Sequence, residues 1–189
     1  MKTTSVMIVG VGGQGSLLAS RLLGTLLTDE GYDVKVSEVH GMSQRGGSVV
    51  TYVKYGDKVF SPIVDQGEAD YILSFEILES ARWISYLKEG GHLITNTQKT
   101  WPMPVITGAM PYPENIAEKL SAMADVRAVD ALALAEQAGS AKAVNVVLIG
   151  VLSRRMDIPE AAWIKAIEET VPAKFLELNK RAFQLGREA

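Results

Sequence analysis

The chain has 189 residues, of which 47% are hydrophobic and 22% charged, the ordinary proportions of a globular protein that is long enough for a substantial core. Its formal net charge of -3 argues against a nucleic-acid-binding protein, which normally carries a basic face. It has no cysteine and only two histidines, which excludes a disulfide framework, a cysteine-ligated iron–sulfur cluster or zinc site, and a histidine-rich metal site in this chain.

The start of the chain carries one lysine before an apolar run, without the charged region, long apolar core and cleavage site of a secretory signal. No apolar stretch reaches the roughly 20 residues that cross a bilayer. We therefore expect a cytoplasmic protein without membrane contact.

The first half of the chain alternates apolar runs with amphipathic segments. In chain order, the pattern predicts a strand at 5–9, a helix at 16–30 that Gly31 ends, strands at 34–39 and 48–55, a hairpin strand at 58–63 after the Gly56-Asp57 turn, a strand at 71–75, a helix at 77–87 that Gly90-Gly91 ends, and a strand at 92–95.

The second half begins with a proline-rich region at 101–113, where prolines argue against a helix and a short strand at 105–106 is the alternative. The elements predicted after it are a helix at 115–123, a strand at 126–129, a helix from an Asp130 cap to 137, an apolar helix at 141–156, a helix at 159–170 with Pro159 in its first turn, and a helix at 172–185. The helix at 141–156 has little polar face, which indicates burial between layers or in a subunit contact.

This alternation predicts an α/β fold: a Rossmann-like, mainly parallel sheet with antiparallel edge strands and helices on both faces. The sequence contains no linker, repeat or low-complexity tract. Residues 1–189 are therefore expected to form a single domain, whose helices from about residue 141 pack on the sheet.

A glycine-rich turn follows the first predicted strand and contains Gly10, Gly12, Gly13, Gln14 and Gly15. The order strand, Gly-x-Gly-x-x-Gly, helix is typical of the phosphate-binding unit of Rossmann-type domains. Glycine lets the backbone approach a pyrophosphate closely, and the N–H groups of the first helical turn attract an anion. The alternative is a turn whose glycines only solve a packing problem.

A second loop, between the predicted strands at 34–39 and 48–55, contains Ser43, Gln44, Arg45, Gly46 and Gly47. Ligands of open α/β sheets bind where the loops at the carboxyl ends of parallel strands meet, so we expect this loop to lie near the first one. Its arginine offers a planar fork of donors suited to phosphate or carboxylate. The alternative is a surface turn with a solvated arginine.

Together the two glycine motifs, at 10–15 and 38–47, resemble those of the gamma-type subunit of the 2-oxoacid:ferredoxin oxidoreductases, and most of all the small (beta) subunit of the indolepyruvate branch. The resemblance runs from residue 5 to about residue 185. Further matching segments are 60–63, 68–71 and 75–76, with Glu79, Arg82 and Asn145.

The resemblance implies oxidative decarboxylation of a 2-oxoacid, with indolepyruvate, pyruvate or ketoisovalerate as the substrate. In this family thiamine diphosphate carries the carbanion, iron–sulfur clusters pass electrons to ferredoxin, and coenzyme A accepts the acyl group. In fused relatives the equivalent domain is associated with coenzyme A, which implies that both loops face the coenzyme A phosphates or the cofactor interface. The residues so implied are Gly12, Gly13, Gln14, Gly15, Gln44 and Arg45.

Parts of the complete enzyme are missing from this chain. Gly56-Asp57 is followed by Lys58, so there is no Gly-Asp-Gly thiamine diphosphate motif, and no cysteine is present to ligate a cluster. The resemblance therefore implies an accessory subunit, inactive alone, whose larger partner subunit carries thiamine diphosphate and the iron–sulfur clusters and delivers electrons to ferredoxin. A homodimer is an alternative state of the isolated chain.

Other functions stay open on the residues themselves. Glu38 falls near the position of the ribose-binding acid of dinucleotide folds, which favours a self-sufficient NAD(P)-binding dehydrogenase. A non-catalytic assembly module that keeps the fold as an interface is a further alternative. No nucleophile–base arrangement is evident, so no catalytic residue is assigned. His40 is interpreted as a partly buried histidine that holds its loop, with proton transfer as the alternative.

Two smaller expectations concern acidic and aromatic residues. Glu76 directly follows an apolar strand and is the better site candidate in an otherwise solvated acidic run. Trp83, Trp101 and Trp163 are interpreted as core or interface anchors.

Overall fold

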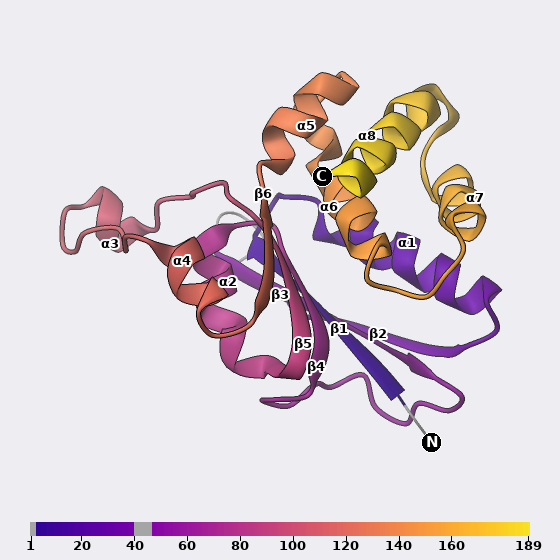
Figure 1. Ribbon diagram of the computed structural model, residues 1–189, viewed down its shortest axis with the longest axis horizontal. Coiled ribbons are helices and arrows are strands. Elements are labelled where there is room, and N and C mark those ends of the chain that lie inside the picture. The colour runs from indigo at the N-terminus through magenta and orange to yellow at the C-terminus, as the bar shows by residue number, and fades with distance from the viewer. Residues whose placement is uncertain (1–2, 40–46) are drawn as a thin grey trace.

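The computed structural model describes residues 3–39 and 47–189, which build a six-stranded sheet in the order β2-β3-β1-β4-β5-β6 (Figure 1). The strands are β1 Thr3–Val11, β2 Asp33–Val39, β3 Ser48–Gly56, β4 Ala69–Ser74, β5 Leu87–Asn96 and β6 Asp125–Val129. The β1–β4, β4–β5 and β5–β6 pairs are parallel, whereas β3 runs antiparallel to both β1 and β2. The α/β prediction is confirmed. The strand that runs opposite to the others is β3, which is the second strand from the edge of the sheet.

Helices cover both faces of this sheet (Figure 1). One face carries α1 Ser16–Asp29, α5 Ala131–Ala138, α6 Val144–Ser153, α7 Glu160–Thr170 and α8 Leu176–Glu188. The other carries α2 Ile77–Trp83 and α4 Ile116–Ser121, while the short α3 Met103–Ile106 stands away from the sheet. Each face has its own hydrophobic core.

Strand β1 shows why the central strands read as continuous apolar runs. Val6 and Ile8 pack in the core on the α1 side, and Met7 and Val9 pack in the core on the α2 side. All four side chains are fully buried. Alternation disappears because both faces of a largely parallel sheet are covered.

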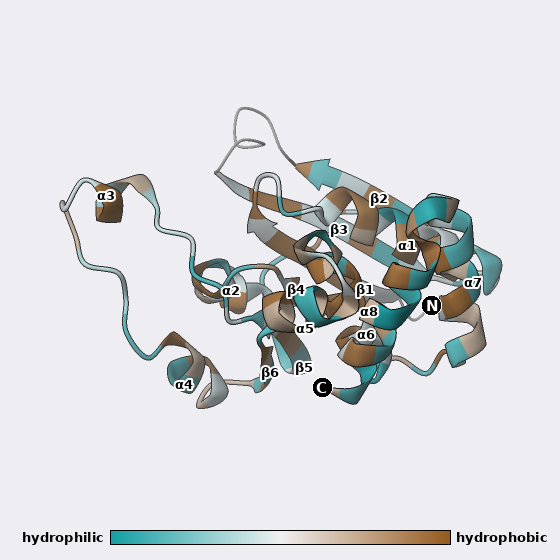
Figure 2. Ribbon diagram, turned by 90° about the horizontal axis from the view of Figure 1, so that it is seen from above, coloured by the Kyte–Doolittle hydropathy of each residue, from teal (hydrophilic) through white to brown (hydrophobic). Residues whose placement is uncertain are grey.

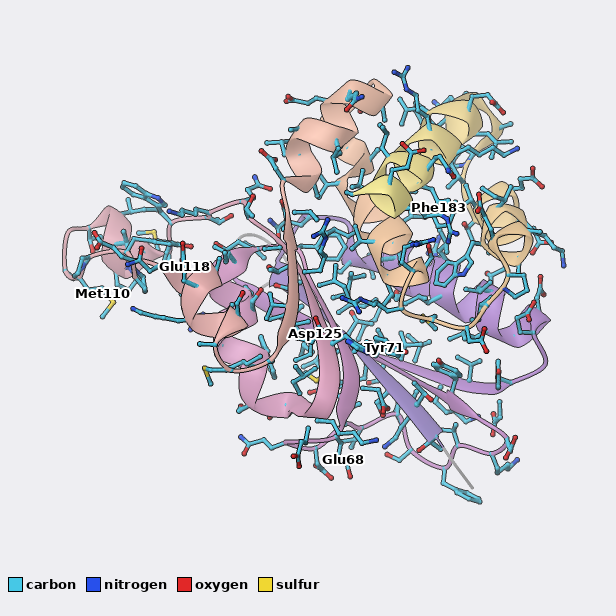
Figure 3. The ribbon with its side chains drawn as sticks, in the orientation of Figure 1. Glu68, Tyr71, Met110, Glu118, Asp125 and Phe183 are labelled. Carbon is cyan, nitrogen blue, oxygen red and sulfur yellow. The ribbon has the colours of Figure 1, made fainter. Side chains whose placement is uncertain are left out.

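Helix α6 lies between the sheet and α8, and all ten of its residues are buried. Gly150 of α6 and Gly186 of α8 allow the two helix backbones to touch, since a Cβ on either would collide with a carbonyl oxygen of the other helix. Beside this crossing, the rings of Trp163 and Phe183 stack with centroids 6.1 Å apart (Figure 3 labels Phe183). The expectation that Trp163 is a core anchor is confirmed.

Two helix signals read from the sequence are also confirmed. Gly31 ends α1 with a φ of 87°, and its N–H donates to the Thr28 carbonyl. Asp130 caps α5, accepting a hydrogen bond of 3.0 Å from the Ala133 N–H. No helix in the described part of the chain has the length and apolar character needed to cross a bilayer.

The predicted hairpin strand at 58–63 is wrong, since that segment forms no strand. A strand there would have to pair with β3, but β1 and β2 already occupy both sides of β3 along its length. The segment instead lies beside the start of β2, where the Val59 N–H donates to the Asp33 carboxylate at 2.9 Å.

Other boundaries differ for local reasons. The helix predicted at 77–87 ends at Trp83 and continues as a 3-10 turn, and Gly90-Gly91 lies inside β5. A Cβ at Gly91 would lie 3.0 Å from the carbonyl oxygens of Ala69 and Asp70, so glycine permits a close approach of β5 to β4. Both expectations for the proline-rich region are wrong, that it contains no helix and that 105–106 forms a strand. These residues belong to the short helix α3, whose Pro104 lies in the first turn, where its missing N–H costs nothing.

The last two helices start later than predicted. Pro159 precedes α7 as its N-cap residue, and Pro172 precedes a 3-10 turn, Ala173–Phe175, that leads into α8. The helix predicted from 141 likewise begins with a 3-10 turn, Ala141–Ala143, before α6.

Candidate functional site

The glycine loop, residues 10–15, joins the carboxyl end of β1 to α1. It turns tightly, with a hydrogen bond of 3.2 Å from the Gln14 N–H to the Val11 carbonyl. Gly13 has a φ of 99° and Gly15 a φ of 89°, a region that residues with a Cβ enter only with strain. This conformation makes glycine necessary at both positions.

Some glycines of the loop are required by close packing rather than by backbone conformation. A Cβ at Gly10 would lie 2.8 Å from Gln14 Oε1 and 2.9 Å from Phe75 Cβ, so Gly10 permits packing inside the protein. A Cβ at Gly15 would lie 2.8 Å from Asn145 Nδ2, whereas no atom of the described residues lies within 4 Å of the position at Gly13. The packing alternative therefore holds for Gly10, while Gly13 meets no neighbour among residues 3–39 and 47–189.

The side chain of Gln14, expected to face a ligand, turns back onto the protein. Its Oε1 accepts a hydrogen bond of 2.8 Å from the Val11 N–H, and its Nε2 donates to the Phe75 carbonyl at 3.5 Å. Asn145 of α6 supports the same loop from the other side, donating to the Gly15 carbonyl at 3.3 Å. The loop is thereby tied to both the sheet and the buried helix.

The two glycine loops meet, as expected from the sheet topology. The Gly12 N–H donates to the Gly47 carbonyl at 2.9 Å. The other residues predicted in the second loop, Ser43, Gln44, Arg45 and Gly46, lie outside the described residues, as does His40.

A cleft of about 550 Å³ opens beside this junction, a size typical of small-molecule sites. Its walls come from the glycine loop, the start of α1 and the facing ends of β2 and β3: Gly12, Gly13, Gly15, Ser16, Leu17, Arg21, Glu38, Val39, Val49, Val50 and Thr51. No side chain among the described residues caps the N-terminus of α1. The N–H groups at the start of this helix and its positive dipole end favour an anion in this cleft.

Two charged side chains in the cleft set its chemistry. Arg21, on the second turn of α1, is exposed and supplies a cation suited to phosphate. Glu38, at the end of β2, accepts a hydrogen bond of 3.1 Å from the Ser20 hydroxyl. Glu38 thus occupies the cleft wall, as the dehydrogenase alternative requires.

A second hollow, of about 480 Å³, lies on the other side of the glycine loop. Gly13, Gln14 and Gly15 line it together with Lys142, which comes from the 3-10 turn before α6. Neither Arg21 nor Lys142 was predicted from the sequence as a site residue. Arg21 was detectable as the arginine on the exposed side of α1, but Lys142 is brought to the loop only by the tertiary fold.

Glu76, the acidic candidate, is buried and fully engaged. One carboxylate oxygen accepts from the Thr100 N–H and the Tyr112 hydroxyl, each at 2.9 Å, and the other accepts from the Glu79 N–H at 2.9 Å as the cap of α2. Burial, and then the neighbouring Glu76 charge, raises the pKa of Tyr112, so its hydroxyl stays a donor. These contacts give Glu76 a structural role.

Comparisons with known proteins find matches over nearly the whole length of this chain. A family model described as pyruvate ferredoxin/flavodoxin oxidoreductase matches residues 5–189. The indolepyruvate oxidoreductase subunit IorB of Thermococcus kodakarensis is 45% identical over 195 residues, covering 100% of this chain and 96% of the relative.

Two solved structures share the fold. The pyruvate oxidoreductase subunit PORC of Thermotoga maritima superposes with a TM-score of 0.78 at 24% identity, covering 100% of this chain and 97% of that one. The 2-oxoglutarate:ferredoxin oxidoreductase of Magnetococcus marinus, solved with 2-oxoglutarate, coenzyme A and succinyl-CoA bound, gives a TM-score of 0.74 at 16% identity, covering 100% of this chain but only 31% of that longer chain.

Proposed function

Because this chain belongs to the pyruvate ferredoxin/flavodoxin oxidoreductase family, we propose that it is the small subunit of a 2-oxoacid:ferredoxin oxidoreductase. The complex would decarboxylate a 2-oxoacid oxidatively to an acyl-CoA. The observation that carries this proposal is the 45% identity, over the full length, to a protein named as an indolepyruvate oxidoreductase subunit. That relative favours indolepyruvate over pyruvate or ketoisovalerate as the substrate. Residues 1–189 would form one gamma-type domain of a cytoplasmic complex.

The division of labour in the complex follows from what this chain lacks. It has no cysteine and no Gly-Asp-Gly thiamine diphosphate motif. A larger partner subunit would therefore hold thiamine diphosphate and the iron–sulfur clusters and would reduce ferredoxin. The isolated small subunit would be inactive, and a homodimer is its alternative state.

Coenzyme A fits the residues around the glycine loop. The N-terminus of α1, which no described side chain caps, favours its phosphates in the 550 Å³ cleft together with Gly13 and the exposed Arg21. Lys142 offers a cation on the other side of the loop. When bound, coenzyme A supplies the thiol that accepts the acyl group. From the sequence we add Ser43, Gln44, Arg45 and Gly46 to the proposed binding residues.

Reconstitution tests the proposed function. A complex recovered through an affinity tag on this chain should reduce a viologen dye with indolepyruvate and coenzyme A. The chain purified alone should give no dye reduction, with or without added thiamine diphosphate. Turnover by the chain alone, or a complex inactive with every 2-oxoacid, would contradict the proposal.

Substitution of the two cations tests the coenzyme A site. Loss of a charge-assisted phosphate contact costs about 1.5–3 kcal/mol, so Arg21→Ala or Lys142→Ala should raise the apparent KM for coenzyme A on the order of tenfold in the complex. Arg181→Ala, an exposed arginine on α8, is the matched control. An unchanged KM in both variants would contradict a coenzyme A site at the glycine loop.

The position of Glu38 in the cleft supports the NAD(P)-binding dehydrogenase as a second candidate. Titration calorimetry of the isolated chain with NADH and NADPH separates the two. We expect no binding, whereas a dissociation constant in the low micromolar range, about -8 kcal/mol, would favour the dehydrogenase.

A further inference from the structure

The segment between β5 and α4 forms an arm, residues 99–113, that stands away from the rest of the protein in both views (Figures 1 and 2). It carries α3, and Met110 lies at its outer end (Figure 3).

The surface of the arm is apolar. Residues 100–113 contain no charged side chain, although 22% of the whole chain is charged. The exposed fractions are 59% for Trp101, 66% for Met103, 61% for Ile106 and 56% for Met110. Tryptophan and methionine without charged neighbours are typical of the buried centre of a protein–protein interface.

The arm is also held in shape before any partner binds. Its two legs meet at the buried carboxylate of Glu76, which accepts from the Thr100 N–H of one leg and the Tyr112 hydroxyl of the other, each at 2.9 Å. The Lys99 ammonium lies over the Tyr112 ring, 5.7 Å from its centroid, and links the legs again.

The tip is stabilised by its own backbone. The N–H groups of Ala109 and Met110 donate to the Pro104 carbonyl at 2.9 and 3.2 Å. Four of the seven prolines of the chain lie in this segment and restrict its backbone: Pro102, Pro104, Pro111 and Pro113. A preformed apolar projection loses little conformational entropy when it binds, which favours its use as an interface.

The base of the arm adjoins the candidate site. Trp101, Pro102 and Met103 line a hollow of about 240 Å³ together with Val11 at the end of β1 and Gly47 of the second loop. A protein that covers the arm therefore reaches the edge of the sheet where the two glycine loops meet.

From this continuity we propose that the arm is the docking element for the larger, thiamine diphosphate-carrying subunit, with Trp101, Met103 and Ile106 as its anchors. The inference rests on the proposed function, in which the remaining active-site groups belong to that subunit and must approach this edge. Docking through the arm places the partner beside the glycine loop, so that one contact both assembles the complex and closes the site.

Site-specific photo-cross-linking tests the arm in the assembled complex. The complex is recovered through a tag on this chain, and its larger subunit is identified by its bound thiamine diphosphate. Benzoylphenylalanine replaces Ile106 in one variant and, as a control, Phe175, a 47% exposed aromatic in the 3-10 turn between α7 and α8. We expect a cross-link from position 106 to the thiamine diphosphate-carrying subunit and none from position 175.

A second measurement uses the triple variant Trp101→Ser, Met103→Ser and Ile106→Ser. It should lower recovery of the larger subunit at least about tenfold, because aromatic anchors dominate binding energy, while the isolated chain keeps its melting temperature.

The outcomes separate the two proposals. A cross-link to a second copy of this chain, or full recovery of the larger subunit by the triple variant, would overturn the arm proposal and leave the proposed function standing. If the wild-type chain recovers no thiamine diphosphate-carrying subunit, both proposals fall.

Discussion

Gly150 in α6 and Gly186 in α8 face each other's helix, whereas Gly13 in the glycine loop faces no other residue of the part of the chain that the structure describes. A Cβ on either helical glycine would collide with a carbonyl oxygen, that of Phe183 or that of Val147. At Gly13 no described atom lies within 4 Å of the Cβ position, and glycine is required by the φ of 99°. One residue type therefore serves tight packing at one place and backbone conformation at the other.

The difference teaches how to weigh a glycine motif. Glycines that serve packing leave no room for another atom, while those of a binding loop hold the backbone in a strained region and leave space in front of it. Gly10, one of the three glycines of the Gly-x-Gly-x-x-Gly motif, belongs to the first class, and Gly13, at one of the variable positions of the motif, belongs to the second. A motif match alone does not say which glycines of the loop face a ligand.

Gly186→Ala should give the largest effect. The added methyl meets backbone on α6, which cannot rotate away, so we expect a loss of at least about 3 kcal/mol in the free energy of unfolding, at the upper end of overpacking costs. The melting temperature should fall by roughly 6–12 °C, measured by calorimetry on the isolated chain. A loss under about 1 kcal/mol would show that α6 and α8 can separate without cost.

Gly13→Ala should have a moderate effect on stability and a clear one on binding. The positive φ costs an alanine about 1–2 kcal/mol, and the methyl enters the proposed coenzyme A site. We expect a higher apparent KM for coenzyme A in the complex, with an unchanged KM for the 2-oxoacid.

Gly67→Ala is the matched control for Gly13→Ala. Gly67 has a φ of 77°, nothing lies within 4 Å of its Cβ position, and it precedes β4, away from the cleft. It should lose similar stability, about 1–2 kcal/mol, without a change in coenzyme A use. Equal KM values for the two variants would contradict a ligand at Gly13.

Gly24→Ala should give the smallest effect, with the opposite sign. Gly24 lies inside α1 with negative φ, and its Cβ would meet only Val36, in ordinary contact at 3.9 Å. Alanine should stabilise the helix by about 0.5–1 kcal/mol, measured as a higher midpoint of urea unfolding. A destabilised variant would mean that close packing of α1 on β2 also requires glycine.

The sequence predicted most of the elements whose signals are local. The run into Gly10, the helix stop at Gly31 and the cap at Asp130 each depend on neighbouring residues, and all three are confirmed. The hairpin strand at 58–63 failed because pairing depends on which edges of the sheet remain open, and β1 and β2 close both sides of β3. No local pattern contains that information.

Some features of the candidate site were also predictable from the sequence, and others were not. The meeting of the two loops followed from sheet topology and is confirmed by the contact of Gly12 with Gly47. The inward turn of Gln14 depends on a contact with Phe75, and the approach of Lys142 depends on the path of the chain before α6. Both arise from contacts between segments more than sixty residues apart. Which loop residues bind coenzyme A stays a prediction.

Because the folded protein buries all ten residues of α6, they are most exposed to water while the chain is being made. The helix emerges from the ribosome ahead of α8, which later covers it. In that interval a stretch without charge, rich in β-branched residues around Val146, Val147 and Ile149, is exposed, and such stretches associate readily with one another. Synthesis at a rate that outpaces the docking of α8, or a nascent chain that stops before it, therefore places the protein at risk of aggregation.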